Sequence, residues 1–479
     1  MKSMLRSRLF EIEQESIAPI PAESRHGRSR ELFTIWFGMN MTPLTVVTGA
    51  TATTLLGLPM VSSIIAILLG HALGGIGMAL HAAQGPQLGV PQMLQARGQF
   101  GSRGASLIVI VAILMFVGYF SSNLIVSSDS VTALLPEASG TALIIGCAVL
   151  SFVIAAFGYN LVRKVTALGA YVVGALVLVS FAALLANGDF WAQMNHGEFT
   201  WTGFLAMVAI GIVWQLTYAP YVSDYSRYMP AKSGTKGAFW GTYLGCVLSS
   251  ALLMVLGSGV GIAVAGVDTM TGLHGLLGPG LGAAVLVGFA LVAAAGNSVN
   301  AYCSALCALT LVETFFSGWR PGARARLVTS MVLHILGVTL ALAAATSFAS
   351  SYFSFLSVLL YVLIPWSAVN LVDYYVIRHG SYAVDEFYAA DGGRYGRWNA
   401  GSLIVFAIGV LAQIPFMATP FYTGPAAEAM GGIDIAWLVG LGVSSLVYIV
   451  IARTAPALVR LDSDTGSGSG SAEPQLLGK

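Results

Sequence analysis

Residues 37–43 read FGMNMTP, in the middle of an otherwise apolar stretch that runs from about Leu32 to Leu58. That stretch is long enough to cross a bilayer, which takes about 20 mostly apolar residues as a helix. A plain membrane anchor would carry Leu and Ala at its centre, whereas this one carries glycine, asparagine and proline. Proline removes a backbone donor and glycine loosens a helix. We therefore predict a helix that breaks halfway across the membrane.

The composition places the whole chain in a membrane. It is 479 residues long, 56% hydrophobic and only 9% charged, whereas an average soluble domain is roughly 25% charged. The mean hydropathy is +0.80. The net charge of +1 gives no basic field that would attract nucleic acid. We expect a polytopic membrane protein whose partners are the lipid bilayer and a small molecule, with no nucleic acid.

The basic residues support a count of twelve spans. When the N-terminus is placed in the cytoplasm, all 22 Lys and Arg fall on cytoplasmic connections or on the two chain ends. This is the distribution that the positive-inside rule requires. We predict an all-α protein of the plasma (inner) membrane with both termini in the cytoplasm and spans at about 31–58, 60–83, 104–135, 141–158, 165–187, 201–229, 236–266, 279–312, 326–347, 350–377, 400–420 and 433–453.

A second broken span follows five spans after the first. Residues 209–230 read AIGIVWQLTYAPYVSDYSRYMP, with Gly211 and Pro220 on either side of a polar, aromatic middle. Interrupted spans at matching places in two halves are typical of inverted-repeat transporters with a binding site near the bilayer midplane. We predict a cytoplasmic segment at 1–30, a first repeat at 31–187, a second repeat at 201–378, two further spans within 400–453 and a flexible cytoplasmic tail at 454–479.

The two breaks collect amides, hydroxyls and aromatic rings, with no Lys, Arg or Glu near mid-depth. A charged side chain at the bilayer centre costs at least ~2.5–3.5 kcal/mol. Aromatic faces offer stacking, and amides can read the edge of a ring. The site therefore suits a flat, neutral, hydrogen-bonding heterocycle. The candidate side chains near the centre are Asn40, Thr42, Tyr119, Asn123, Trp214, Gln215, Tyr218, Asn297, Ser298 and Asn300.

Three motifs resemble the nucleobase–cation symporter family, the purine–cytosine permeases with their cytosine and hydantoin transporter relatives. They are GPQLGVPQMLQARGQFG at 85–101, APYVSDYSRYMP at 219–230 and GNSVNAYCSALCALTL at 296–311. The similarity extends over about residues 30–455. It implies the amino-acid/sodium-symporter fold, a 5+5 inverted repeat with discontinuous spans 1 and 6 and two extra helices. Spans 1, 2, 6 and 7 then rock against spans 3, 4, 8 and 9, and span 10 acts as a thin gate.

The resemblance also implies a substrate site. The family's ring-stacking aromatic of span 3 falls on Tyr119, and its hydrogen-bonding residue one turn later falls on Asn123. The second stacking face comes from the break of span 6, where Trp214, Gln215 and Tyr218 remain open as alternatives. The predicted substrate-binding residues are Tyr119, Asn123, Trp214, Gln215, Asn300 and Thr42.

The cation site departs from the family's sodium-binding pattern. Sodium-coupled relatives use two span-1 carbonyls, here at Gly38 and Met41, together with a carbonyl and two adjacent hydroxyls of span 8. The hydroxyl positions fall on Gly296 and Asn297, so the hydroxyl pair is missing. Unless the Asn297 amide oxygen substitutes, H⁺ is favoured over Na⁺ as the coupling ion, and both stay open. The predicted cation-binding residues are Gly38, Met41, Asn297 and Ser298, and we expect no cofactor and no other metal.

These features predict a secondary active transporter, functional as a monomer, that imports a nucleobase or related neutral heterocycle by H⁺ or Na⁺ symport with alternating access. The alternative is a transporter of another ring, such as allantoin, a hydantoin or a thiamine-like vitamin. A channel or membrane sensor is a weaker alternative, because the polar residues cluster at mid-depth and form no stripe along the spans. An enzyme would need a nucleophile with its base or a metal cluster, and the sequence presents neither.

Overall fold

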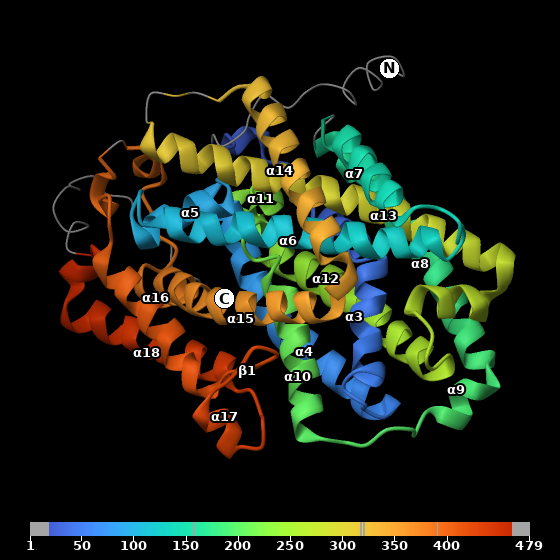
Figure 1. Ribbon diagram of the computed structural model, residues 1–479. Coiled ribbons are helices and arrows are strands. Elements are labelled where there is room, and N and C mark those ends of the chain that lie inside the picture. The colour runs from blue at the N-terminus through green and yellow to red at the C-terminus, as the bar shows by residue number, and fades with distance from the viewer. Residues whose placement is uncertain (1–18, 157–158, 317–318, 320, 390, 462–479) are drawn as a thin grey trace, which may run out of the picture.

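The computed structural model describes residues 19–156, 159–316, 319, 321–389 and 391–461. Within these ranges the chain forms long helices joined by short connections (Figure 1). Parts of three predicted segments lie outside the described residues, namely 1–18 of the N-terminal segment, 157–158 of the fourth span and 462–479 of the tail.

Eight of the seventeen α-helices in the described residues are 18 residues or longer. The α-helices are α2 (Ser29–Met39), α3 (Pro43–Thr54), α4 (Met60–Leu88), α5 (Gln92–Phe100), α6 (Ala105–Thr132), α7 (Gly140–Ala156), α8 (Tyr159–Ala186), α9 (Gly188–Gln193), α10 (Trp201–Leu216), α11 (Val222–Ser226), α12 (Ala231–Ala263), α13 (Thr269–Phe315), α14 (Ala323–Ala344), α15 (Phe348–Leu371), α16 (Ala400–Gln413), α17 (Pro425–Ala429) and α18 (Ala436–Thr454).

The remaining elements are short. Helix α13 contains a kink at Gly278, where φ is 74°, and two strands pair antiparallel in the segment before α17. The strands are β1 (Ala418–Thr419) and β2 (Tyr422–Thr423); the 3₁₀ turns are η1 (Ala22–Ser24), η2 (Ala345–Ser347), η4 (Val384–Tyr388), η5 (Gly393–Tyr395), η6 (Ile414–Phe416) and η7 (Pro456–Val459); and η3 (Val372–Ile377) is a π-helical turn.

Both predicted breaks are present. Helix α2 ends at Met39, and α3 begins at Pro43, whose fixed φ and missing N–H suit the first position of a helix. Helix α10 ends at Leu216, and α11 begins only at Val222. Each break leaves a few residues of irregular backbone, which is tolerated inside a membrane protein only where it is covered by protein or lines a cavity.

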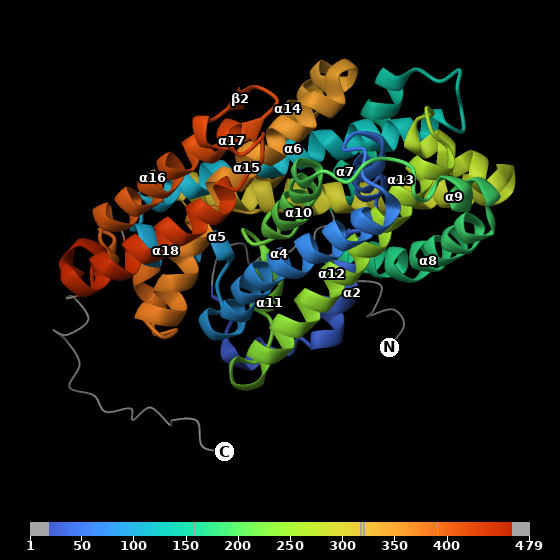
Figure 2. The same cartoon turned by 90° about the horizontal axis from the view of Figure 1, so that it is seen from below.

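Two groups of helices pack around these breaks. The first, here called the bundle, consists of α2, α3, α4, α10, α11 and α12, which contact one another extensively. The second, here called the scaffold, consists of α6, α7, α8, α13 and α14. Helix α15 contacts α10 of the bundle and α6 of the scaffold, and α16 and α18 pair beside it at one edge (Figure 2).

Glycines allow the broken helix α2–α3 to lie close against α12. A Cβ added at Gly49 of α3 would collide with the backbone of Met254, and one added at Gly257 of α12 would collide with the backbone of Val46. Small residues at such crossings let two backbones approach closely and pack without voids. The break of span 1 is therefore held rigidly inside the bundle.

A chain of buried polar side chains lies at the end of the molecule that carries the predicted cytoplasmic loops. Gln84 of α4 donates to Asn370 of α15 at 2.7 Å, and Asn370 donates to Gln99 of α5 at 3.3 Å. Gln99 donates in turn to the hydroxyl of Tyr382 at 2.9 Å, which donates to Asp373. These bonds tie the bundle to α15, α5 and the loop before α16.

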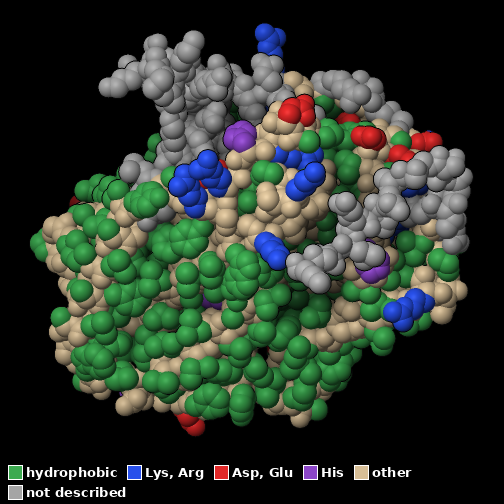
Figure 3. Space-filling model, turned by 180° about the vertical axis from the view of Figure 1, so that it is seen from behind, with side chains coloured by type: hydrophobic (Ala, Val, Ile, Leu, Met, Phe, Trp, Pro, Cys, Tyr) green, Lys and Arg blue, Asp and Glu red, His purple; other side chains and the backbone are tan. Residues whose placement is uncertain are grey.

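The outer surface suits a bilayer. Within the described residues, six helical segments are long and apolar enough to cross a membrane, and four shorter apolar helices accompany them. Figure 3 shows a wide apolar surface on one face, with most of the visible charged side chains gathered in its upper part. The predicted mostly helical membrane protein is confirmed at this level, and the count of twelve spans and the inverted repeat stay predictions.

Candidate substrate site between the broken helices

A small cavity of about 40 Å³ lies between the two helix breaks. Its walls come from α2–α3, α6, α10 with the turn that follows it, and α13. Within the described chain, no Asp, Glu, Lys, Arg or His is among the lining residues, so the cavity carries no fixed charge. The lining residues are Met39, Thr42, Leu44, Tyr119, Asn123, Trp214, Thr217, Tyr218, Tyr221, Gly296 and Asn300.

Two aromatic rings form one corner of this cavity. The ring centroids of Tyr119 and Trp214 are 6.0 Å apart and nearly perpendicular, at 87°. Tyr119 also packs edge-to-face against Phe355 of α15, with centroids 5.3 Å apart. Aromatic side chains of this kind pack edge-to-face with one another and can also stack on a planar ligand. Helix α15 therefore contacts the predicted stacking residue directly.

Two amide side chains face the aromatic corner. Asn123 of α6 and Asn300 of α13 are each only 8% exposed. Within the described residues, Oδ1 of Asn123 has no hydrogen-bond partner. A buried polar atom without a partner costs about 1–3 kcal/mol unless water or a ligand satisfies it. These two side chains are therefore suited to bind the polar edge of a ring.

Five of the six predicted substrate-binding residues line this one cavity, and Gln215 does not. Its Nε2 lies 2.9 Å from Nδ1 of His71 and 3.4 Å from Oγ of Ser250, so it faces α4 and α12. Neighbouring helix residues point about 100° apart, and the structure turns Trp214 towards the cavity. The placement of Gln215 at the stacking face is corrected accordingly: it lies behind the wall that Trp214 forms.

The sequence analysis did not single out Thr217 and Tyr221, which also line the cavity. Thr217 donates to the carbonyl of Trp214 at 2.7 Å. The ring of Tyr221 packs against Phe116, with centroids 5.0 Å apart. Both residues belong to the irregular segment between α10 and α11. The polar and aromatic composition of that segment is the sequence feature that could have indicated them as cavity-lining residues.

The span-1 carbonyls predicted to bind a cation are partly engaged. The carbonyl of Gly38 accepts backbone N–H groups from Asn40 and from Met41, the latter at 3.1 Å. A carbonyl oxygen has two lone pairs, so both are used within the break. The side chain of Met41 is completely buried.

The span-8 residues offer little free oxygen. The hydroxyl of Ser298 faces α7, where it donates to the carbonyl of Ser151 at 2.8 Å. Asn297 donates from Nδ2 to the carbonyl of Phe120 at 3.2 Å, and its Oδ1 has no partner within the described residues. Gly296 has no side-chain oxygen. Asn297 thus holds the one uncommitted side-chain oxygen among the predicted cation-binding residues.

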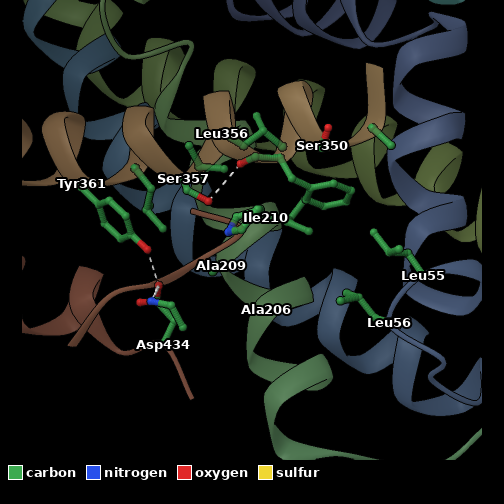
Figure 4. A pocket seen from close by; sticks show the side chains of 16 residues that line it. Leu55, Leu56, Ala206, Ala209, Ile210, Ser350, Leu356, Ser357, Tyr361 and Asp434 are labelled. Atoms are coloured by element: carbon green, nitrogen blue, oxygen red, sulfur yellow. Dashed lines mark hydrogen bonds between the residues drawn. The ribbon is translucent and has the colours of Figure 1, made fainter. Parts of the chain in front are cut away.

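A second, larger hollow of about 480 Å³ lies between the end of α3, α10, α15 and the segment before α18 (Figure 4). Leucine, alanine and isoleucine side chains make up most of its wall, with Leu55 and Leu56 on one side. The opposite end is polar, because the hydroxyl of Tyr361 donates to Asp434. One wall, α10, belongs to the bundle, and another, α15, does not.

Residues 19–440 match the family model described as permease for cytosine/purines, uracil, thiamine, allantoin. The chain belongs to this permease family. The resemblance predicted from the three motifs is thereby confirmed. The protein YxlA of Bacillus subtilis (strain 168), named as a purine-cytosine permease on a provisional basis, is 36% identical over 93% of this permease and 96% of its own length. The purine-cytosine permease fcyB of Emericella nidulans is 24% identical over 92% of this permease and 88% of its own length.

The fold of the permease is shared with solved transporters. Mhp1, a nucleobase-cation-symport-1 family transporter solved in a closed conformation with bromovinylhydantoin bound, superposes with a TM-score of 0.74. The match covers 95% of the permease and 99% of Mhp1 at 18% identity, so it supports the fold alone. The permease is a nucleobase-type membrane transporter and not an enzyme.

Proposed function

We propose that this permease imports an uncharged nucleobase-like ring by cation symport with alternating access. The observation that best supports this proposal is the cavity between the two broken helices. Tyr119 and Trp214 contribute aromatic rings to its wall, and Asn123 and Asn300 contribute amides. A flat heterocycle stacks on the rings while its edge atoms exchange hydrogen bonds with the amides.

The lack of fixed charge in the lining favours a neutral cargo. An ionised ligand taken out of water loses its hydration, and only a well-placed counter-charge offsets that loss. The lining residues provide hydroxyls and amides, which satisfy neutral donors and acceptors. Amino-acid and sugar-acid substrates, which carry full charges, fit this cavity poorly.

We infer that H⁺ is the coupling ion. The carbonyl of Gly38 already accepts two backbone N–H groups, Gly296 has no hydroxyl, and Ser298 is turned towards α7. Sodium needs several oxygen ligands at one place, and these residues leave few. The Oδ1 of Asn297 is the oxygen that would have to compensate if Na⁺ were used instead.

The architecture proposed for this transport is the one predicted from the sequence. It has twelve spans in the inner membrane, two five-helix repeats at 31–187 and 201–378, both termini in the cytoplasm and a monomer as the working unit. The bundle would rock against the scaffold, with α15 as the gate. The contact between Phe355 of α15 and Tyr119 supports that gate, because a movement of α15 changes the wall of the cavity.

A thermal-shift screen of the purified protein tests the substrate class. The panel contains cytosine, adenine, guanine, hypoxanthine, uric acid, allantoin, hydantoin and thiamine. A ligand present at 100 times its Kd stabilises the folded state by about 2.7 kcal/mol, which a melting curve resolves. Stabilisation by a neutral ring is the expected result. If every ring leaves the melting temperature unchanged, or if only charged compounds raise it, the proposed substrate class is wrong.

Uptake into proteoliposomes tests the ion. The stabilising ring is offered under an inward pH gradient without Na⁺, and then under an inward Na⁺ gradient at equal pH. We expect accumulation under the pH gradient, abolished by a protonophore. Accumulation that needs Na⁺ and resists the protonophore would contradict H⁺ coupling.

The second candidate cargo is a hydantoin-like or allantoin-like ring. The allantoin permease of Bacillus subtilis is 32% identical over 108 residues, 22% of this chain, and Mhp1 was solved with bromovinylhydantoin bound. Such rings are also flat and neutral. The same thermal-shift panel separates them from purines and cytosine.

A further inference from the structure

We propose that Asn40 is a positioning residue: it joins the two helix breaks and holds Trp214 and Tyr218 in the orientation that forms the substrate-facing wall. This inference rests on the proposed function, because it assigns Asn40 a role at that same site. The side chain of Asn40 is completely buried and does not line the cavity. It therefore acts through its neighbours and not by touching the ring.

The side-chain carbonyl of Asn40 accepts two hydrogen bonds from the break of span 6. Nε1 of Trp214 donates to Oδ1 at 2.9 Å, and the hydroxyl of Tyr218 donates to the same oxygen at 2.8 Å. Both donors belong to rings that line the cavity. One amide oxygen in span 1 thus fixes the planes of two aromatic walls in span 6.

The amide nitrogen of Asn40 is committed as well. Nδ2 donates to the carbonyl of Trp36 at 3.0 Å and to Sγ of Cys246 in α12 at 3.2 Å. Two donors and two acceptor sites are all that an asparagine amide possesses. With every one used and the side chain completely buried, it has a single low-energy orientation.

The chemistry of the partners fixes which end of the amide faces which neighbour. An indole N–H can only donate, and a backbone carbonyl can only accept. The oxygen of Asn40 must therefore face Trp214, and its nitrogen must face the carbonyl of Trp36. A flipped amide would place donor against donor and acceptor against acceptor.

The backbone of Asn40 links these side-chain hydrogen bonds to the break of span 1. Its carbonyl accepts the backbone N–H of Thr42 at 2.8 Å and the hydroxyl of Thr45 at 2.8 Å, and its N–H bonds to the carbonyl of Gly38. A change at the carbonyls of this break is consequently passed through one residue to the rings of span 6. The span-1 break and the stacking wall move as one unit.

A double-mutant cycle tests this role. Asn40→Leu keeps the branching and the number of side-chain heavy atoms and leaves the indole and phenol donors without an acceptor, whereas Asn40→Asp keeps an acceptor for both. Binding of radiolabelled cytosine and of radiolabelled hypoxanthine is measured for each variant in the wild-type background and in a Trp214→Phe/Tyr218→Phe background, which lacks both donors.

We expect Asn40→Leu to weaken binding about tenfold in the wild-type background, which is about 1.4 kcal/mol, because two hydrogen bonds no longer hold the rings. Asn40→Asp restores the acceptor for both rings but sets its second oxygen against the carbonyl of Trp36, so it should recover only part of that loss. In the background without donors, Asn40→Leu should add less than about a twofold loss. An equal loss in both backgrounds, or wild-type affinity in Asn40→Leu, would overturn the proposal.

A ligand-free measurement keeps this test separate from the proposed function. Amide hydrogen exchange in residues 211–222 should accelerate in Asn40→Leu without any added ring, because the break of span 6 loses its tie to span 1. Gln413→Leu is the matched control: it removes a buried amide of α16 whose Nε2 donates to the carbonyls of Tyr361 and Gly409. That variant should leave exchange in 211–222 unchanged.

The two failures are distinguishable. If wild-type protein binds neither radiolabelled ring nor any member of the panel, the proposed function fails while the exchange measurement still decides the role of Asn40. If wild-type protein binds a ring but exchange in 211–222 is the same in Asn40→Leu as in wild type, the positioning role is refuted and the proposed function stands.

Discussion

Asp224→Ala should loosen the predicted cytoplasmic side of the permease. Asp224 lies in α11 of the bundle, and its Oδ1 accepts the backbone N–H of Gln92 at the start of α5, at 2.9 Å. The carboxylate also lies beside the thiol of Cys303 in α13 of the scaffold. Both contacts cross from the bundle to helices outside it. In the proposed rocking motion, they would be lost when the bundle swings away from these helices.

The size of the effect follows from the contacts that are removed. A hydrogen bond to a charged group contributes about 1.5–3 kcal/mol. Every 1.4 kcal/mol is a factor of ten in an equilibrium constant, so the open population should rise roughly tenfold to a hundredfold. Asp224→Asn keeps an acceptor but loses the charge, and it should produce an intermediate increase.

Native cysteines report the opening. The side chains of Cys303 and Cys307 are 0% and 4% exposed, and both lie beside Asp224. N-ethylmaleimide labels them only when α11 separates from α13, and mass spectrometry gives the rate for each thiol. When opening and closing are fast compared with labelling, that rate tracks the open population. We expect the labelling rates of Cys303 and Cys307 to be higher in Asp224→Ala than in the wild-type protein.

Cys246 serves as the internal control, because it is buried inside the bundle between α12 and the break of span 1. A rigid-body opening leaves it covered. Equal acceleration at all three thiols would indicate general unfolding, and no acceleration at Cys303 and Cys307 in Asp224→Ala would refute the assignment of Asp224 to the closed side.

Three further predictions concern the cavity. Tyr119→Ala removes a stacking face and should abolish saturable uptake of the ring found in the screen, while the ligand-free melting temperature shifts by only a few degrees; wild-type uptake would contradict the stacking role. Asn300→Ala removes an amide at the ring edge and should alter the ranking of rings in a competition assay, whereas an unchanged ranking would exclude it from recognition. Gly296→Ser should fold normally, since an added Cβ meets nothing within 4 Å, and the new hydroxyl should increase stabilisation by Na⁺; equal Na⁺ response in both proteins would argue against a cation site there.

The positions of both breaks could be predicted from local sequence alone. Pro43 cannot donate a backbone hydrogen bond, and Pro220 has the same defect, so each disfavours an uninterrupted helix. Pro365 nevertheless lies inside α15, so the polar and glycine neighbours of Pro43 and Pro220 are part of the signal. The structure starts α3 at Pro43 and leaves Pro220 in the turn between α10 and α11. These are properties of a few consecutive residues, which is why they can be read without knowing the fold.

The direction of a side chain beside a break could not be predicted in the same way. Trp214 and Gln215 are neighbours, and about 100° of helix rotation separates the cavity from the interior of the bundle. Ser298 likewise faces Ser151 of α7. Helix phase near an interruption depends on how the whole helix packs, and composition contains no information about it.

Contacts between segments that are distant in sequence could not be predicted either. Asn40 was among the polar residues of the first break, but its partners Trp214 and Cys246 lie 174 and 206 residues away in sequence. The chain from Gln84 to Asp373 joins four separate elements in the same manner. Only the packed structure reveals that an amide has all of its partners.

The distribution of contacts across the boundary of the bundle bears on the direction of transport. On the predicted cytoplasmic side, Gln84 donates to Asn370 and the hydroxyl of Tyr375 donates to the carbonyl of Leu80, both at 2.7 Å. On the opposite side, α10 and α15 face each other across the hollow of about 480 Å³. Separating buried hydrogen-bonded groups leaves polar atoms unsatisfied, whereas widening an apolar hollow breaks few contacts. We therefore expect opening to the predicted outside to cost less than opening to the predicted cytoplasmic side, an asymmetry that supports the proposed import of the ring.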